Sequence, residues 1–249
     1  MKKIIGILFL FLISISNAKT IRVGSSFPVK KVKQALQLAV DGDTIIVNGG
    51  VYKEGNILIN KKIIFLGKNF PVLDGQRKFE VISVNADNVV IKGFKIINSG
   101  YASLDDPCGI KVYDKSFVKI ENNILDNNFF GIYLQNSRNC LIKNNKITAY
   151  GKQEQLIGNG IHCWKSDNLQ IIANKISGHR DGIYFEFVTN SIIWRNISTA
   201  NVRYGLHFMF SHNDSYISNV FKNNQDAFIK MESVPSALSL TEELVIRDA

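Results

Sequence analysis

Cysteine is scarce in this chain, and its arrangement excludes a disulfide-stapled fold. The 249 residues include three cysteines, Cys108, Cys140 and Cys163, an odd number without a C-x-x-C pair, so no disulfide framework is legible. No nucleotide-binding motif is present, and the apolar run from Ile4 to Ile15 is too short to span a bilayer comfortably. These absences leave the class of the protein to be decided by its repeats.

The first residues have the form of an export signal. Two lysines precede the apolar run, and Ser16-Asn17-Ala18 places small residues where a signal peptidase cuts. We predict a signal peptide over residues 1–18 and an exported mature chain. The formal net charge is +9, and a basic exported protein can meet acidic glycans, anionic lipid or an acidic protein. Scattered lysines favour a soluble surface instead.

A unit of about 22 residues recurs along most of the chain. Two markers, a Gly-apolar pair and an asparagine anchor, keep the same spacings of 22, 29, 22 and 23 residues. The glycines are Gly109, Gly131, Gly160, Gly182 and Gly205, and the asparagines are Asn123, Asn145, Asn174, Asn196 and Asn219. A repeat of this period indicates a solenoid, whose equivalent positions stack into columns.

Short β-rich runs separated by polar turns identify the solenoid type. A leucine-rich repeat would need L-x-x-L-x-L, and a propeller blade would need about 40 residues. We therefore predict an all-β, right-handed parallel β-helix over residues 19–224. An amphipathic helix at 29–40, with Ser25-Ser26 at its start, would cap the open core. Residues 225–249 lack the repeat and are predicted to be a cap, or the tail of a solenoid that is cut short.

Two segments depart from the rhythm and predict loops on one face. The extra seven residues fall in Gly151–Gly158, and Tyr101–Pro107 is a second candidate. Insertions in repeat proteins often lie on the binding face. A further asparagine column, eight residues after the glycines, predicts stacked amides and left-handed turns at Asn139, Asn168, Asn190 and Asn213.

Alternation along the strand after each glycine separates inward from outward columns. The third residue points inward and is apolar, and it includes Cys163 as a small core residue. The second residue after each glycine points outward, and this column consists of Lys111, Tyr133, His162, Tyr184 and His207. The fourth residue also points outward, and its column consists of Tyr113, Gln135, Trp164, Glu186 and Met209. We therefore predict an outer face that carries most of the chemistry-bearing side chains.

This face offers candidate metal ligands, although they are widely spaced. The candidates are His162, His207, Met209, His212, His179 and Glu186, and His with Met is the ligand softness expected of copper handling. His162 and His207 lie two rungs apart, about 10 Å from rung spacing, which is wide for one ion. A glycan-binding face and a protein-docking or structural face are open alternatives, with Trp164, Tyr184, Arg180, Asp181 and Arg203 as contact residues.

Acid–base chemistry on a uronic acid polymer is a further alternative. Asp181 and Glu186 project from one rung near two histidines, and a carboxylate with His and Tyr could perform such chemistry. The carboxylates do not form a column, however, and a lone Asp-Gly is more often turn chemistry. Arg180 and Arg203 are expected to pair with these carboxylates or to contact an anion. We predict no catalytic residues.

Two consecutive motifs carry a family resemblance. His179–Phe187 (HRDGIYFEF) followed by Arg203–His212 (RYGLHFMFSH) resembles the paired signature of the NosD family, periplasmic accessory proteins of nitrous oxide reductase maturation. The resemblance implies a periplasmic β-helix without enzymatic activity. Its partners would be an ABC transporter's membrane subunit, a copper chaperone lipoprotein and the reductase, and copper would be bound transiently. It implies that His162, His179, Glu186, His207, Met209 and His212 contact copper or a partner.

Overall fold

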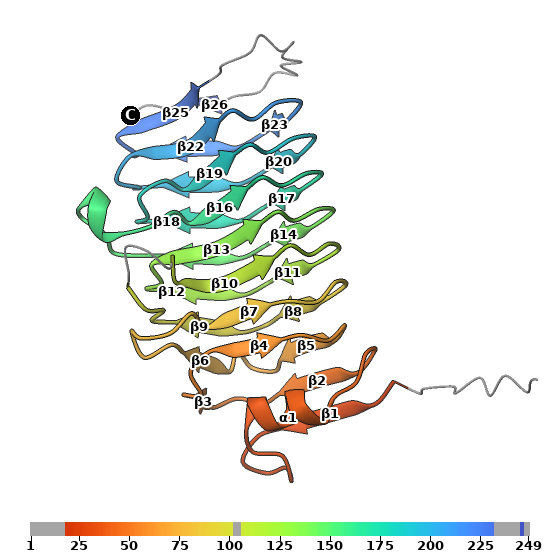
Figure 1. The fold of residues 1–249 in the computed structure, drawn as a ribbon. Coiled ribbons are helices and arrows are strands. Elements are labelled where there is room, and N and C mark those ends of the chain that lie inside the picture. Colours follow the sequence, from red (N-terminus) through yellow and green to blue (C-terminus); the bar gives the residue numbers. More distant parts are fainter. Residues whose placement is uncertain (1–17, 102–105, 232–244, 247–249) are drawn as a thin grey trace, which may run out of the picture.

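The chain winds into a stack of rungs bounded by three parallel sheets, shown in Figure 1. The computed structural model describes residues 18–101, 106–231 and 245–246, so the predicted signal peptide lies outside the described residues except for Ala18. Each regular rung contributes one short strand to every sheet. Neighbouring strands in a sheet are therefore about 22 residues apart in sequence, and all pairings are parallel. This is a parallel β-helix.

The first sheet consists, in order, of β1 (Thr20–Val23), β2 (Thr44–Val47), β5 (Ile64–Gly67), β8 (Val90–Lys92), β11 (Lys119–Glu121), β14 (Leu141–Lys143), β17 (Gln170–Ile172), β20 (Ile192–Trp194) and β23 (Ser215–Ile217). The second consists of β4 (Ile57–Ile59), β7 (Ile82–Val84), β10 (Cys108–Tyr113), β13 (Phe130–Gln135), β16 (Ile161–Trp164), β19 (Ile183–Glu186), β22 (Tyr204–Met209) and β25 (Asp226–Met231). The third consists of β3 (Val51–Tyr52), β6 (Val72–Asp74), β9 (Lys95–Ile97), β12 (Ile124–Asp126), β15 (Lys146–Thr148), β18 (Lys175–Ser177), β21 (Ile197–Thr199), β24 (Val220–Lys222) and β26 (Val245–Ile246).

The core fills the space between the sheets with columns of apolar side chains. The residue after each repeat glycine and the third residue after it are fully buried, as predicted, and Cys163 is one of them. Phe185 and Phe208 occupy neighbouring places in the third-residue column, with ring centroids 5.4 Å apart. Burying apolar area at roughly 25 cal/mol per Å² makes this column a main source of stability.

A ladder of buried asparagines holds the corner between the first and third sheets. In each link the side-chain amide donates to the side-chain oxygen of the next anchor, as from Asn145 to Asn174 (3.0 Å) and from Asn174 to Asn196 (3.0 Å). The amide also donates to a main-chain carbonyl, as Asn174 does to Ile142 (2.9 Å). The stacked hydrogen bonds thus lie mainly in the anchor column rather than the exposed one. The exposed column does adopt the predicted left-handed turns, with φ of 51° at Asn168.

The glycines mark the corner between the third and second sheets, where neighbouring rungs approach closely. A Cβ on Gly131 would lie 2.3 Å from the carbonyl oxygen of Gly160, and one on Gly182 would lie 1.8 Å from the hydroxyl of Ser198. These positions exclude a side chain because of space, which explains why glycine restarts each unit.

The N-terminal cap is a shorter helix than the sequence predicted. Helix α1 spans Val32–Leu38, and Val29 pairs instead with Val23 in an extended bridge. No side chain at its N-terminus caps it, so Ser25-Ser26 is not the cap. The Glu54 carboxylate accepts from the main-chain N–H groups of Val32 (2.8 Å) and Lys33 (3.0 Å). A distant acidic side chain therefore satisfies the first free donors of the helix.

The second sheet continues past the predicted end of the repeat. Strand β25 pairs in parallel with β22, aligning Tyr204 with Asp226 and Leu206 with Phe228. Ala227 thus takes the register position of a repeat glycine, which is why the sequence pattern missed it. Residues 232–244 and 247–249 lie outside the described residues. Within the described ranges, no helix is long and apolar enough to cross a membrane.

Candidate functional site

In the second sheet, the outward column formed by the second residue after each repeat glycine is a buried layer. Alternation had predicted that this column would be an exposed face. His162, Tyr184 and His207 are only 8%, 8% and 7% exposed, although they lie outside the apolar core. Their rings follow one another along the axis, tilted for His162–Tyr184 (centroids 4.7 Å apart, planes at 57°) and edge-on for Tyr184–His207 (4.6 Å, 87°). The side chains just before the repeat glycines fold back over this column, as Phe130 does over His162 at 5.4 Å.

A buried carboxylate organises one end of this layer. Asp181 is fully buried, and its oxygens accept from Arg203 Nε (3.0 Å) and Nη2 (2.6 Å), with His207 Nδ1 at 3.3 Å. Burial raises the pKa of Asp181, but the hydrogen bonds from His207 and Arg203 outweigh it, so the net pKa is lowered. The predicted pairing of Asp181 with Arg203 is confirmed, and the carboxylate is an ionised internal anchor.

The same arginine ties the insertion loop to the stack. Arg203 Nη1 donates to Glu154 Oε1 at 2.9 Å, and Glu154 begins the short 3-10 helix η1 (Glu154–Leu156), which projects from the side of the stack in Figure 1. The neighbouring Arg180 donates to the Asn159 side chain instead (3.2 Å). The network therefore runs from the outer layer through Asp181 and Arg203 into the loop.

Three buried imidazoles keep one nitrogen without a hydrogen-bond partner. The Nε2 atoms of His162, His179 and His207 have none within the described part of the chain. Burial lowers the pKa of His162 to about 3 and that of His179 to about 4, so both rings are neutral near pH 7. Neutral imidazole nitrogen is the form that binds metals.

The predicted metal candidates do not converge on one point. His179 is fully buried, with Nδ1 3.3 Å from the carbonyl of Gly158, whereas His212 is exposed in the turn after β22. Tyr184 donates to Met209 Sδ (3.1 Å) and Glu186 Oε2 (3.4 Å), so these three do lie together. In the described ranges, no group of three or more His, Cys, Asp or Glu is placed to hold a metal ion.

Trp164 continues this outer face one rung before Glu186. The two residues are register partners in neighbouring strands, and Trp164 is half-buried with the Lys165 ammonium 4.4 Å from its ring centroid. Cys163 behind it stays a thiol, because burial raises its pKa well above the ordinary value. The inward position of Cys163 in the apolar core disfavours a thiolate metal ligand there.

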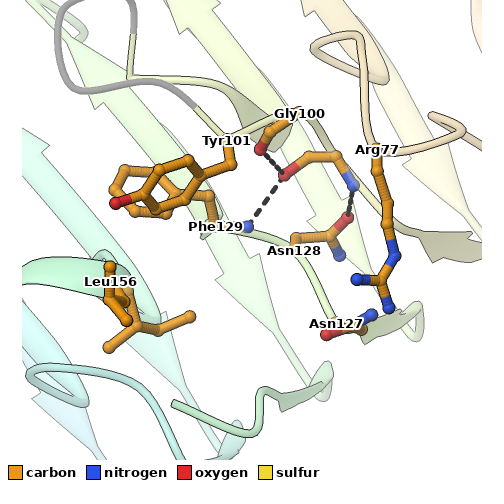
Figure 2. A pocket seen from close by; sticks show the side chains of 9 residues that line it. Arg77, Gly100, Tyr101, Asn127, Asn128, Phe129 and Leu156 are labelled. Carbon is orange, nitrogen blue, oxygen red and sulfur yellow. Dashed lines mark hydrogen bonds between the residues drawn. The ribbon is translucent and has the colours of Figure 1, made fainter. Parts of the chain in front are cut away.

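A pocket lies between Tyr101, the first residue of the predicted loop 101–107, and the other predicted loop; residues 102–105 lie outside the described residues. The Tyr101 hydroxyl donates to the Gln155 carbonyl at 3.3 Å, which brings the start of one loop against the other. The pocket has a volume of about 320 Å³ and is shown in Figure 2; it is lined by Arg77, Ser99, Gly100, Tyr101, Asn127, Asn128, Phe129, Leu156 and Ile157. None of these residues was named as a site residue from the sequence, although the loop prediction pointed to their neighbourhood.

A second hollow of about 310 Å³ shares Gly100 and Tyr101 with this pocket. Its floor holds Glu80, whose carboxylate oxygens accept from the Tyr113 hydroxyl at 3.0 and 3.2 Å. Burial raises the pKa of Glu80. The two hollows therefore combine exposed aromatic rings with a few fixed polar groups, the usual composition of a ligand site.

The fold has relatives among known proteins. The family described as right handed beta helix region matches residues 39–167 and 80–242, and the chain belongs to this family. This confirms the predicted handedness and fold class. No curated protein matches the chain.

Several solved structures share the fold at low identity. The catalytic domain of a GH87 alpha-1,3-glucanase is 15% identical with a TM-score of 0.71, covering 82% of this chain and 39% of that one. A GH136 lacto-N-biosidase from Eubacterium ramulus is 11% identical with a TM-score of 0.65, covering 86% and 55%. Pectate lyase Pel9A is 15% identical with a TM-score of 0.58, covering 91% and 83%. The chain thus spans 39% and 55% of the first two structures, and identity this low shows the fold alone.

Proposed function

We propose that this protein is an exported, periplasmic accessory factor for nitrous oxide reductase maturation, acting with an ABC transporter in copper delivery. The observation that carries the proposal is that the two motifs behind the family resemblance meet in one network. Asp181 of the first motif binds Arg203 and His207 of the second. The network then fixes the insertion loop through Glu154. A rigid, shaped side wall of this kind suits docking of a partner.

The geometry argues against Asp181 as an acid or base. Its carboxylate is fully buried and held by Arg203, so no substrate atom reaches it. In this proposal copper is cargo, and His162, His207 and Met209 supply the soft nitrogen and sulfur ligands that suit it. His162 and His207 are buried, so a contact with copper would require the outer layer to open.

Complementation tests the maturation role. We expect a denitrifying cell that lacks this gene to make a reductase without its copper–sulfur site, seen as loss of that site's absorption and of activity. The wild-type gene should restore both, and Arg138→Gln, an exposed residue outside this network, should restore them equally well. A reductase that is fully assembled without the gene overturns the proposal.

Copper binding by the purified protein is a separate test. We expect Cu(I) to bind, and the paired substitution His207→Ala with Met209→Ala to weaken binding, with Gln170→Ala as an exposed control outside the candidate ligands. If the paired variant binds Cu(I) as tightly as the wild type, His207 and Met209 are not the copper ligands, whereas the docking role remains possible to test.

A second candidate function is a carbohydrate-binding or carbohydrate-acting β-helix. It is supported by the names of the similar structures, which are mostly carbohydrate-active enzymes, and by the aromatic pocket between the loops. These comparisons favour the second candidate over the first, whereas the motif resemblance and the buried Asp181 favour the first.

Incubation with polysaccharides separates the two candidates. A carbohydrate-active enzyme should depolymerise polygalacturonate, alginate or an α-1,3-glucan without any partner protein, releasing reducing ends. A binding module should retain one of these polymers without cleaving it. If the protein neither binds nor cleaves any of these polymers, the second candidate is ruled out.

A further inference from the structure

The pocket of Figure 2 has an apolar wall made of exposed rings. Tyr101 is 56% exposed and meets Phe129 edge-on, with ring centroids 5.1 Å apart and planes at 85°. Leu156, 52% exposed, comes from the insertion loop. Large apolar side chains that stay exposed around a hollow mark a ligand-binding groove.

This wall is held in place from both sides. The Tyr101 hydroxyl is bound to the Gln155 carbonyl, and Phe129 packs against Phe130 with centroids 5.2 Å apart. The main-chain N–H of Phe129 donates to the Ser99 hydroxyl at 2.8 Å. A ring that is fixed before a ligand arrives loses little conformational freedom on binding.

The opposite side of the pocket carries a positive charge. Figure 2 shows Arg77 extending along that side toward Asn127. Its backbone has φ of 58°, next to Gln76 at 57°, which is uncommon for such residues, and backbone strain of this sort gathers at functional sites. None of the ion pairs in the described ranges includes Arg77, and no carboxylate lines the pocket there.

Most polar groups between the rings and the arginine are already hydrogen-bonded within the protein. The Asn128 side-chain oxygen accepts from the Ser99 N–H at 3.0 Å, and its amide donates to the Ile96 carbonyl at 3.0 Å. The Asn127 amide donates to the Asn98 side-chain oxygen at 2.9 Å. The side-chain oxygen of Asn127 can therefore accept a hydrogen bond from a ligand. A ligand therefore meets a cation and a neutral acceptor.

We infer that this pocket binds an acidic sugar, a pyranose ring bearing a carboxylate within a glycan chain. The apolar face of the ring would lie against Tyr101 and Leu156, its carboxylate would pair with the forked donors of Arg77, and a hydroxyl would donate to Asn127. The adjoining hollow beside Phe79 and Tyr113 has room for a neighbouring sugar. This inference rests on the second candidate function and specifies its ligand.

Calorimetric titration of the full chain tests the inference, with trigalacturonate as the acidic probe and its methyl ester as the neutral one. We expect the acidic probe to bind more tightly. Arg77→Gln should weaken it about ten-fold or more, the usual scale of a charge-assisted contact, and leave the ester unchanged. Tyr101→Ala should weaken both. Arg138→Gln, an exposed arginine in a turn of another corner, is the matched control and should change neither.

The other outcomes are distinguishable. Equal binding of ester and acid, with Arg77→Gln silent, overturns the acidic ligand but leaves a carbohydrate-binding function standing. Acetate competing as well as trigalacturonate shows a bare carboxylate site and overturns recognition of the sugar. If neither probe binds but the protein retains another polysaccharide, the ligand proposed for this pocket is wrong and the carbohydrate-binding function remains.

Discussion

Two corners of the same β-helix use polar side chains in opposite ways. At the asparagine corner, between the first and third sheets, Asn174 gives and receives hydrogen bonds in a continuous ladder. At the glycine corner, between the third and second sheets, loops enter, a carboxylate is buried, and three imidazole nitrogens have no partner in the described chain. The difference separates a corner that only holds rungs together from one that is modified for binding.

Breaking the ladder should have the largest effect. Asn174→Ala removes the acceptor for both the N–H and the side-chain amide of Asn145 and the donor to Ile142. Each buried group left unsatisfied costs about 1–3 kcal/mol, so we expect a loss of about 4 kcal/mol in the free energy of unfolding, measured by urea denaturation. Asn168→Ala, in the exposed column, should cost about 1 kcal/mol. Equal losses would contradict a special role for the ladder.

Removing the cation at the glycine corner should cost slightly less. Arg203→Met leaves the Asp181 carboxylate buried without its main partner, and an uncompensated buried charge costs about 3 kcal/mol. Glu154→Gln, at the half-exposed end of the same network, should cost less than about 1 kcal/mol. Urea denaturation checks both, and similar costs would show that Asp181 is not the energetic centre.

Acid should affect the glycine corner before the asparagine corner. The pKa values of His162 and His179 are lowered on folding to about 3 and about 4, so the unfolded chain takes up protons first as the pH falls below about 6.5. Stability is therefore lost as pH falls, by about 2 kcal/mol per histidine between pH 7 and 5.

The variant His179→Gln should reduce this pH dependence by about 2 kcal/mol, read from denaturation at both pH values. Gln170→Asn, at an exposed and uncharged residue, should leave it unchanged. The lowered pKa of Asp181 adds its own loss only below about pH 3.8. The contribution of His162 should remain in this variant, so an undiminished pH dependence would show that folding does not lower the pKa of His179.

The smallest effect should come from the remaining corner, between the second and first sheets. Phe117 has φ of 60° and is 51% exposed, in a column that otherwise carries Asn139, Asn168 and Asn190. Asparagine accepts the left-handed conformation more easily than phenylalanine, so Phe117→Asn should stabilise the protein by up to about 1 kcal/mol. Destabilisation, seen as a lower urea midpoint, would show that the ring is used in packing.

Local repetition made the fold predictable. The inward columns and the loop positions follow from alternation and from the two markers, because each depends on residues close in sequence or one period away. The cap was less predictable, since Glu54 reaches α1 from another rung. Strand β25 was missed because Ala227 stands where glycine was expected.

The site was harder to predict because it depends on side chains that fold across rungs. Alternation placed His162 and His207 outside the core, which is correct, but it could not show that Phe130 and Asp181 lie over them. The pocket joins Arg77, Tyr101 and Leu156, which share no period. Only the two insertions indicated where to look.

The asparagine ladder also gives the stack a polarity. Every amide from Asn123 to Asn196 donates toward the C-terminal side, so the small dipoles add along the axis. A rung can join this array in one orientation only, with its oxygen facing the preceding amide. The β-helix therefore has a direction. Each rung offers its side-chain amide donor to the next rung on one side only, so rungs can be added in a single orientation.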